Sequence, residues 1–284
     1  MVPRKMRIAV SGNDGFIAPH LLEMLGDVAS EIPFEALDDS RLLDGALASC
    51  ACLIHFNGHP PNSEIDRNDP DSPQLMKEWA RVILDAKKRH QGLHLILVGS
   101  LRVHPEYVDE RFSGETTLSP RDATAEGQLW VEERALENAT DDSPVSILRV
   151  SNVHGLPVGG GKGRGYLHSF AGEALTGWIG VPGDGQGIKE IIHVADVCSI
   201  IAEVAHSRPP TREALAIGNG WAVPISELAE AIASKMGADV QMWAPEKEEL
   251  WGVVEVGYLK ERIGYEPMAD MQDIISEAMA NASF

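Results

Sequence analysis

Glycines mark a stretch near the amino terminus where an apolar run gives way to a helical pattern. Residues 8–10 are apolar, Gly12 and Gly15 follow, and leucines at helical spacing come next. Ala18 stands where a third glycine is usual in the dinucleotide pattern. Glycines at such a turn let the backbone approach a diphosphate, and the free N–H groups of the helix favour this anion. The stretch indicates either a dinucleotide site or a plain tight turn.

An acidic residue further along the chain favours the dinucleotide. In dinucleotide-binding folds, a carboxylate about 20 residues beyond the glycines binds the ribose of the adenosine. Asp38 comes 20 positions after Ala18. We expect Asp38 to bind this ribose, with capping of a strand end as the alternative role. A carboxylate at this place favours NAD over NADP as the cofactor.

The charge of the chain argues against one class of partner. Its 284 residues include 43 acidic and 24 basic ones, for a net charge of −19. Nucleic-acid binding needs clustered Lys and Arg to contact phosphates, so we expect no nucleic-acid partner. No apolar run approaches the ~20 residues that span a membrane, and the amino terminus lacks the features of a secretory signal. We therefore expect a cytoplasmic protein with no membrane partner.

Cysteine content agrees with a reducing compartment. Cys50, Cys52 and Cys198 are too few for a disulfide framework. Two of them flank the start of an apolar run, which favours buried thiols over a metal site. We expect no metal in this protein.

The elements that must position these residues follow from hydrophobic periodicity. Short apolar runs alternate with segments of helical spacing, which predicts an α/β protein with a parallel, doubly wound sheet. The link between the second strand and the next helix is very short, so a strand usual in larger sheets is missing. The predicted strands lie at 8–10, 31–39, 52–56, 94–100 and 145–150, and the predicted helices at 40–49, 73–90 and 123–138.

The texture of the chain changes after residue 155. A glycine-rich stretch at 155–166 carries Lys162 and Arg164, which could hold a phosphate or lie in a solvated loop. A further helix is predicted over 224–237. We predict a dinucleotide-binding domain over residues 1–155 and a mainly substrate-binding lobe over 156–284, some segments of which return to the sheet. Such a lobe is expected over the carboxyl ends of the strands, where open α/β sheets bind ligands.

Seven stretches in the same order resemble motifs of one protein family. S-G-N-D-G-F-I-A-P-H-L is similar to T-G-x-x-G-F-I-G-x-x-L, and L-R-V-S-N-V-H-G is similar to L-R-x-S-N-V-Y-G. The family is the extended short-chain dehydrogenases/reductases, which include the NAD-dependent epimerases and dehydratases of sugar nucleotides. The stretches lie at 11–25, 53–58, 95–104, 148–155 and 182–197, and near the carboxyl terminus at 217–232 and 259–267.

The resemblance implies a Rossmann-type sheet with a smaller C-terminal substrate lobe, NAD as the cofactor and a nucleotide-sugar as the substrate. It also implies a homodimer formed through the two long helices. For this chain the cofactor-binding positions that it implies, beside Asp38, are Gly12, Asp14, Gly15, Phe16, Ile17 and Asn57.

The chain departs from the family at the catalytic pair. In the family a tyrosine and a lysine stand one helical turn apart, and the tyrosine moves a proton while hydride moves to or from the nicotinamide. The matching positions here are Thr124 and Gln128. Neither side chain can replace its counterpart, because a threonine hydroxyl is far too weak an acid and an amide carries no charge. Tyr107 and Arg111 have the right spacing but lie too close to the preceding strand.

Other functional positions of the family are retained. Ser100 matches the serine that hydrogen-bonds the reacting oxygen, and a strand-end cap is its alternative role. Asn152 matches a residue near the diphosphate of the nucleotide-sugar, and a turn is its alternative. His193 matches a histidine that is more often structural. His104 and Glu126 are the candidates for an improvised acid or base.

Two functions of different classes follow. The first is an NAD(P)-binding, epimerase- or dehydratase-like enzyme that acts on a sugar nucleotide or a related small polar substrate through a non-standard acid/base arrangement. The second is a catalytically inactive binding or regulatory subunit that keeps the fold. Turnover that depends on Ser100 would distinguish the first from the second.

Overall fold

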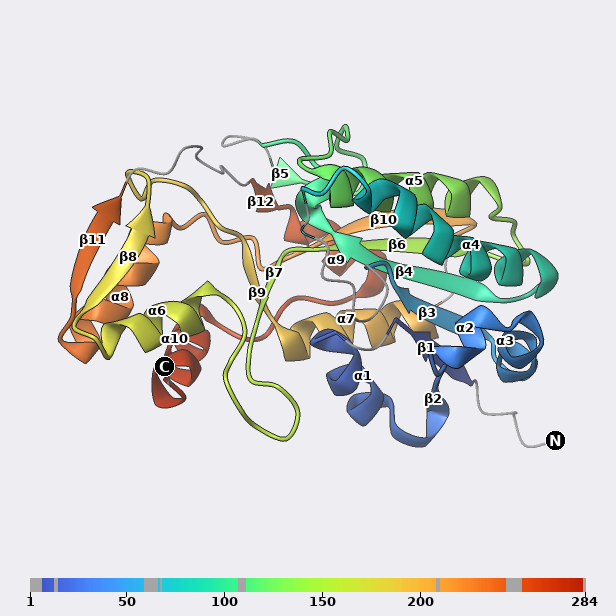
Figure 1. The fold of residues 1–284 in the computed structure, drawn as a ribbon, viewed down its shortest axis with the longest axis horizontal. Helices are drawn as coiled ribbons and strands as arrows, with labels where there is room; N and C mark the ends of the chain where they lie inside the picture. Colours follow the sequence, from blue (N-terminus) through green and yellow to red (C-terminus); the bar gives the residue numbers. More distant parts are fainter. Residues whose placement is uncertain are drawn as a thin grey trace. The chain divides into compact units, whose positions relative to one another are not determined.

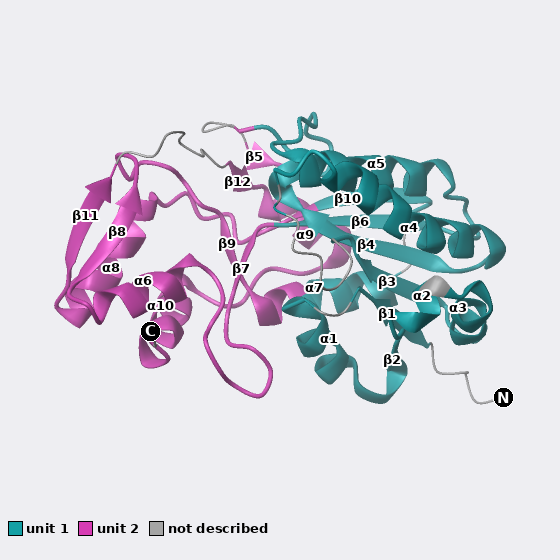
Figure 2. Cartoon of the chain, in the orientation of Figure 1, with its two compact units in different colours: residues 1–105, 114–150, 198–215 teal, residues 106–113, 151–197, 216–284 magenta. Residues whose placement is uncertain are grey.

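A computed structural model of the chain describes residues 7–12, 15–58, 66, 68–106, 111–207, 210–243 and 252–282. The chain divides into two compact units, and each is built from several separate stretches (Figure 2). Unit 1 consists of residues 1–105, 114–150 and 198–215, and unit 2 of 106–113, 151–197 and 216–284.

A six-stranded sheet organises unit 1, with the strand order β10-β6-β4-β3-β1-β2 (Figure 1). Neighbouring strands from β2 to β6 pair in parallel. The order reverses between β1 and β3, which is the switch point of a doubly wound sheet. The strands are β1 (Ile8–Ser11), β2 (Ala29–Glu31), β3 (Cys52–Phe56), β4 (His94–Ser100), β6 (Val145–Val150) and β10 (Arg212–Ile217). The predicted Rossmann-type fold is confirmed.

Helices cover both faces of this sheet (Figure 1). One face carries α3 (Ser40–Leu47), α4 (Ser72–Arg89) and α5 (Ala123–Glu137), and the other carries α1 (Ile17–Leu25) and α7 (Val194–His206). The Cys198 thiol of α7 lies 3.8 Å from the Ile17 carbonyl of α1.

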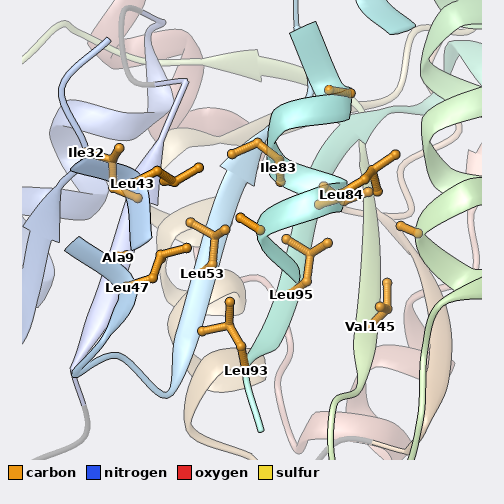
Figure 3. Close-up of a cluster of buried hydrophobic side chains, with 14 of the residues drawn as sticks. Ala9, Ile32, Leu43, Leu47, Leu53, Ile83, Leu84, Leu93, Leu95 and Val145 are labelled. Carbon is orange, nitrogen blue, oxygen red and sulfur yellow. The ribbon is translucent and has the colours of Figure 1, made fainter. Parts of the chain in front are cut away.

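Alternate residues of each central strand point to the same face, because the side chains of a strand alternate. Ala9, Leu53, Leu95 and Val145 therefore form one buried row across four strands (Figure 3). Leucines and isoleucines from α3 and α4 pack on this row and close the hydrophobic core, among them Leu43, Leu47, Ile83 and Leu84.

The predicted strand at 31–39 is wrong. β2 ends at Glu31, and the following residues form the single-turn helix α2 (Glu35–Asp38). The turn starts with hydrogen bonds from Ala36 N to Pro33 O and from Leu37 N to Phe34 O, each about one turn apart. This conformation buries Ala36 and Leu37 in the core of unit 1 together with Ile32, which an extended strand would not achieve on one side.

Unit 2 has its own apolar core, formed by three helices that pack on a small sheet. The helices are α6 (Tyr166–Ala174), α8 (Ile225–Met236) and α10 (Met271–Ala280), and the sheet pairs β8 (Trp178–Pro182) with β11 (Asp239–Trp243) in parallel. Two further parallel pairs are β7 (Asn152–His154) with β9 (Ile191–His193) and β5 (Arg111–Phe112) with β12 (Val253–Val254); the remaining helix is α9 (Val256–Ile263).

The boundary predicted after residue 155 and the observed units divide the chain differently. The second stretch of unit 1 ends at Val150, and residues 198–215, with the first part of β10, also belong to unit 1. The short stretch 106–113 belongs to unit 2. The roles of the two units in binding stay a prediction. Within the described ranges, no helix combines the length and apolar character that a membrane crossing requires.

Candidate functional site

The turn between β1 and α1 has a backbone that only glycine suits at its first position. Gly12 has φ +75°, and a Cβ there would lie 2.6 Å from the carbonyl oxygen of Phe56. Gly15 is different, because a Cβ there would meet no atom of the described residues within 4 Å. The first glycine is thus required by the fold, whereas the second leaves open space beside the turn.

The helix after this turn begins in a way that suits an anion. Phe16 precedes α1 and makes no side-chain cap, and the first turn of α1 contains no acidic residue. Phe16 therefore adds no side-chain cap to the backbone N–H groups of this turn, and the helix dipole adds a partial positive charge there. Ile17 begins the helix, and Ala18 is buried where a third glycine is usual. Asp14 lies outside the described residues.

The end of β1 is tied to the end of β3. Ser11 Oγ lies 2.9 Å from Nδ1 of His55, and both side chains are buried. Burial lowers the pKa of His55 to about 4, so this ring is neutral at pH 7. The pair fixes the two strands beside the glycine turn without placing a charge there.

The structure draws attention to a carboxylate that the sequence pattern did not single out. Asp38 belongs to α2 and not to a strand end, and its side chain lies outside the described part of the chain. Glu31 is the last residue of β2 and is exposed, opposite Val10 of β1. Counting from Gly12 instead of Ala18 would have found it, since the interval is 19 positions.

Asn57 and Gln128 hold the end of β3 to α5. The Gln128 side chain donates to the Asn57 carbonyl at 2.8 Å, and the Asn57 side chain donates to the Gln128 carbonyl at 3.4 Å. Both side chains are buried. The amide at the position of the family's lysine therefore makes a reciprocal link between two elements, a partnership across 71 residues that no local pattern indicates.

Thr124 and Ser72 form a second link one turn earlier on α5. Their hydroxyl oxygens lie 2.9 Å apart, and Ser72 is fully buried at the start of α4. Glu126, two residues further along α5, is exposed. The structure therefore places a hydroxyl pair where the family has a phenol, with an exposed carboxylate two residues further on.

Ser100 and His104 follow β4. The Ser100 hydroxyl accepts a hydrogen bond from the backbone N–H of Arg102 at 3.3 Å, which is the strand-end cap considered above, and the residue is half-buried. His104 is fully buried; this burial, with Arg149 and Arg121 nearby, lowers its pKa to about 3. A neutral buried ring is poorly suited to donate a proton near pH 7. Tyr107 lies outside the described residues, and Arg111 is in β5 of unit 2.

The predicted substrate residues belong to unit 2. Lys162 and Arg164 are exposed on the glycine-rich loop between β7 and α6. Asn152 is half-buried, and its side chain donates to the Glu190 carbonyl at 2.9 Å, which links β7 to β9. The two basic residues present positive charge to solvent, whereas Asn152 serves the local fold in this structure.

Metal chemistry finds no support in the described ranges. No group of three or more His, Cys, Asp or Glu side chains there has an arrangement that could hold a metal ion. Burial raises the pKa of the Cys198 thiol to about 12 and that of Cys52 still further, so both are neutral thiols at pH 7.

Comparisons with known proteins agree with this architecture. No protein-family model matches the chain. A dTDP-glucose 4,6-dehydratase from an Actinoplanes species is 25% identical over an alignment 317 positions long, which covers 97% of each chain.

Solved structures with the same fold span nearly the whole chain. A dTDP-glucose 4,6-dehydratase of Bacillus anthracis in complex with NAD superposes with a TM-score of 0.79 at 18% identity, covering 97% of this chain and 96% of the other. MoeE5 in complex with UDP-glucose and NAD gives a TM-score of 0.80 at 18% identity, covering 96% and 97%. The chain has the fold of NAD-dependent sugar-nucleotide dehydratases and epimerases.

Proposed function

We propose that this chain is an NAD-dependent enzyme of the dehydratase and epimerase type that acts on a nucleotide-linked sugar without a tyrosine–lysine pair. The observation that carries the proposal is the turn between β1 and α1. At Gly12 the carbonyl oxygen of Phe56 leaves no room for a Cβ, whereas a Cβ at Gly15 would meet no described atom within 4 Å. Phe16, before α1, makes no side-chain cap. The similar proteins that are described with NAD support the choice of cofactor.

The residues of unit 1 fit the parts of this cofactor. The backbone at Gly12 and Gly15 and the first N–H groups of α1 would hold the diphosphate. Glu31, at the end of β2, is our proposed ligand for the adenosine ribose, a role earlier assigned to Asp38. NAD bound there supplies the hydride acceptor for the reaction.

The side chains toward the other end of the cofactor define the non-standard arrangement. The hydroxyls of Ser100 and Thr124 would contact the reacting oxygen, and the Ser72 hydroxyl would orient that of Thr124. Gln128 keeps α5 in place through Asn57 and carries no charge. Neither candidate for a proton-transfer group fits beside these hydroxyls. His104 is buried and neutral, and Glu126 is exposed two residues from Thr124 on α5, a spacing at which helical side chains do not face each other.

NAD binding can be tested by thermal unfolding of the whole chain. At 100 times its dissociation constant, a ligand stabilises the folded state by about 2.7 kcal/mol. We expect NAD to raise the melting temperature more than NADP does. Gly15→Val should fold normally and lose the shift, because a Cβ there meets no described atom within 4 Å and the side chain then occupies space beside the turn. Gly45→Ala, in equally open surroundings on α3, should retain the shift.

Catalysis needs a separate measurement with dTDP-glucose and UDP-glucose as substrates. We expect NAD-dependent turnover that falls by about 100-fold in Thr124→Ala, a typical cost of removing one hydrogen-bond donor from the reacting oxygen. Ser100→Ala should also lose turnover. Binding of NAD without turnover on either sugar, or turnover unaffected in both variants, would contradict the proposed enzyme. The first result would instead favour the inactive binding subunit.

A further inference from the structure

The glycine-rich loop of unit 2 is closed at its base and extends away from it. Figure 1 shows it as a long excursion between β7 and α6. Gly155 and Arg164 join its two ends through backbone hydrogen bonds of 3.3 Å and 2.8 Å. Its tip, residues 158–162, is exposed and includes Lys162. The conformation of the tip therefore depends on the contacts that the base of the loop makes.

Three histidine rings from three elements lie against the base of this loop. A Cβ on Gly163 would overlap the ring of His168 in α6, and one on Gly165 would overlap the ring of His154 in β7. A Cβ on Gly155 would lie 3.3 Å from Nε2 of His193 in β9. The glycines thus let the loop backbone approach the rings more closely than any other residue type would allow.

One carboxylate lies between two of these rings. Glu277 of α10 places its oxygens 3.6 Å from Nε2 of His168 and 3.4 Å from Nε2 of His193. Tyr166 of α6 packs edge-on against His154, with ring centroids 4.6 Å apart. Burial lowers the pKa values of His154, to about 3, and of His168, so both rings are neutral at pH 7. The neutral rings of His154 and His168 let the loop backbone pack closely against them.

We propose that His154, His168 and His193, held by Glu277, are positioning residues that fix the glycine-rich loop so that Lys162 and Arg164 bind the diphosphate of the substrate. The identity of this anion rests on the proposed function. The rings act through the shape of the loop and not through contact with the ligand. A loop of consecutive glycines has much conformational freedom to lose on binding, and packing on the rings removes part of it beforehand.

The contact between Gly163 and His168 allows a test by complementary changes of size. We expect Gly163→Ala to weaken binding of dTDP or UDP by about tenfold, because the added methyl pushes the loop off the ring. His168→Ala should also weaken binding, since the loop loses the ring against which it packs. The double variant should bind better than either single variant, because the methyl occupies part of the space that the ring leaves. In turnover, the change should fall on KM and leave kcat nearly constant.

Two controls separate this inference from the proposed function. Gly45→Ala, far along the sequence in unit 1, should bind dTDP and UDP like the wild type. Hydrogen exchange of the ligand-free protein should be faster at residues 155–165 in His168→Ala than in the wild type. Failure of the wild type to bind either nucleotide would overturn the proposed substrate, whereas unchanged loop exchange or a double variant no better than the singles would overturn the positioning role.

Discussion

At the scale of single residues, Glu190 shows how unit 2 depends on one buried carboxylate. Glu190 directly precedes β9 in the sequence, and its side chain is fully buried. It accepts three backbone hydrogen bonds, from Asn219 at 2.7 Å, Gly220 at 2.9 Å and Val254 at 2.8 Å. It thereby joins three segments that are distant in the sequence. Burial outweighs these hydrogen bonds and raises the pKa of Glu190 to about 7.

This raised pKa predicts a pH dependence of stability. The folded state binds the Glu190 proton more tightly than the unfolded state, so its contribution is fully present below pH ~4.5 and is lost as the pH rises through about 7. The difference in unfolding free energy between the wild type and Glu190→Gln should fall by up to about 3 kcal/mol between pH 4.5 and 8. Urea unfolding across this range measures it. Glu203→Gln, at an exposed site, should show no such trend.

Single residues also show how far the sequence could lead to the site. Gly12 and Gly15 are found from a local pattern, because their role depends on the turn in which they stand. The partner of Gln128 could not be found in this way, since Asn57 comes 71 positions earlier and meets it only after the sheet has formed. The loop glycines can be identified in the sequence. Their packing against the rings of His154 and His168 cannot, because the fold brings these residues into contact.

At the scale of elements, α5 and β6 are joined by a buried ion pair. Glu132 accepts from Arg149 through two guanidinium nitrogens at 2.9 Å and 3.0 Å, and both side chains are nearly fully buried. Arg149→Leu would leave the carboxylate buried without its charged partner, at a cost of about 3–5 kcal/mol. Replacing both residues with leucine should recover much of this loss, because no uncompensated charge remains.

Chemical unfolding of the single and double variants measures this coupling. On the same helix, Arg134 and Glu137 form an exposed pair at 2.7 Å, which provides a matched control. Arg134→Leu should cost no more than about 1 kcal/mol. A double variant at 132 and 149 as unstable as Arg149→Leu alone would contradict the prediction.

Elements with a strong pattern of their own were predicted well, and those that depend on their neighbours were not. β3, β4 and β6 are apolar runs buried on both faces, so their composition indicates them directly. β2 has three residues, two of them exposed, and exists because it pairs with β1. The sequence after it, with Ile32 and Phe34, has apolar residues that suit a strand as well as a helical turn, and burial against the sheet selects the turn.

At the scale of the whole molecule, a net charge of −19 repels anionic ligands at long range. Any anion site must then be built locally, from backbone N–H groups or basic side chains. Unit 1 offers the N–H groups at the start of α1, and unit 2 offers Lys162 and Arg164 on its loop. Screening by salt weakens the long-range repulsion more than the short contacts. We therefore expect added salt to weaken the binding of NAD and of the substrate less steeply than it weakens the binding of anions to a basic protein.

The proposed division of the anion sites between the units predicts two separate patterns of hydrogen exchange. NAD should slow exchange in unit 1, at Gly12, at residues 15–18 and at β2, because the diphosphate orders the N–H groups of α1. dTDP should slow exchange in unit 2, at residues 155–165 and at the start of α6. Each ligand should leave the other region unchanged when added alone, with α3 serving as an internal reference. Protection of the β1–α1 turn by dTDP, or of the loop by NAD, would contradict the assignment of the cofactor to unit 1 and the substrate diphosphate to unit 2.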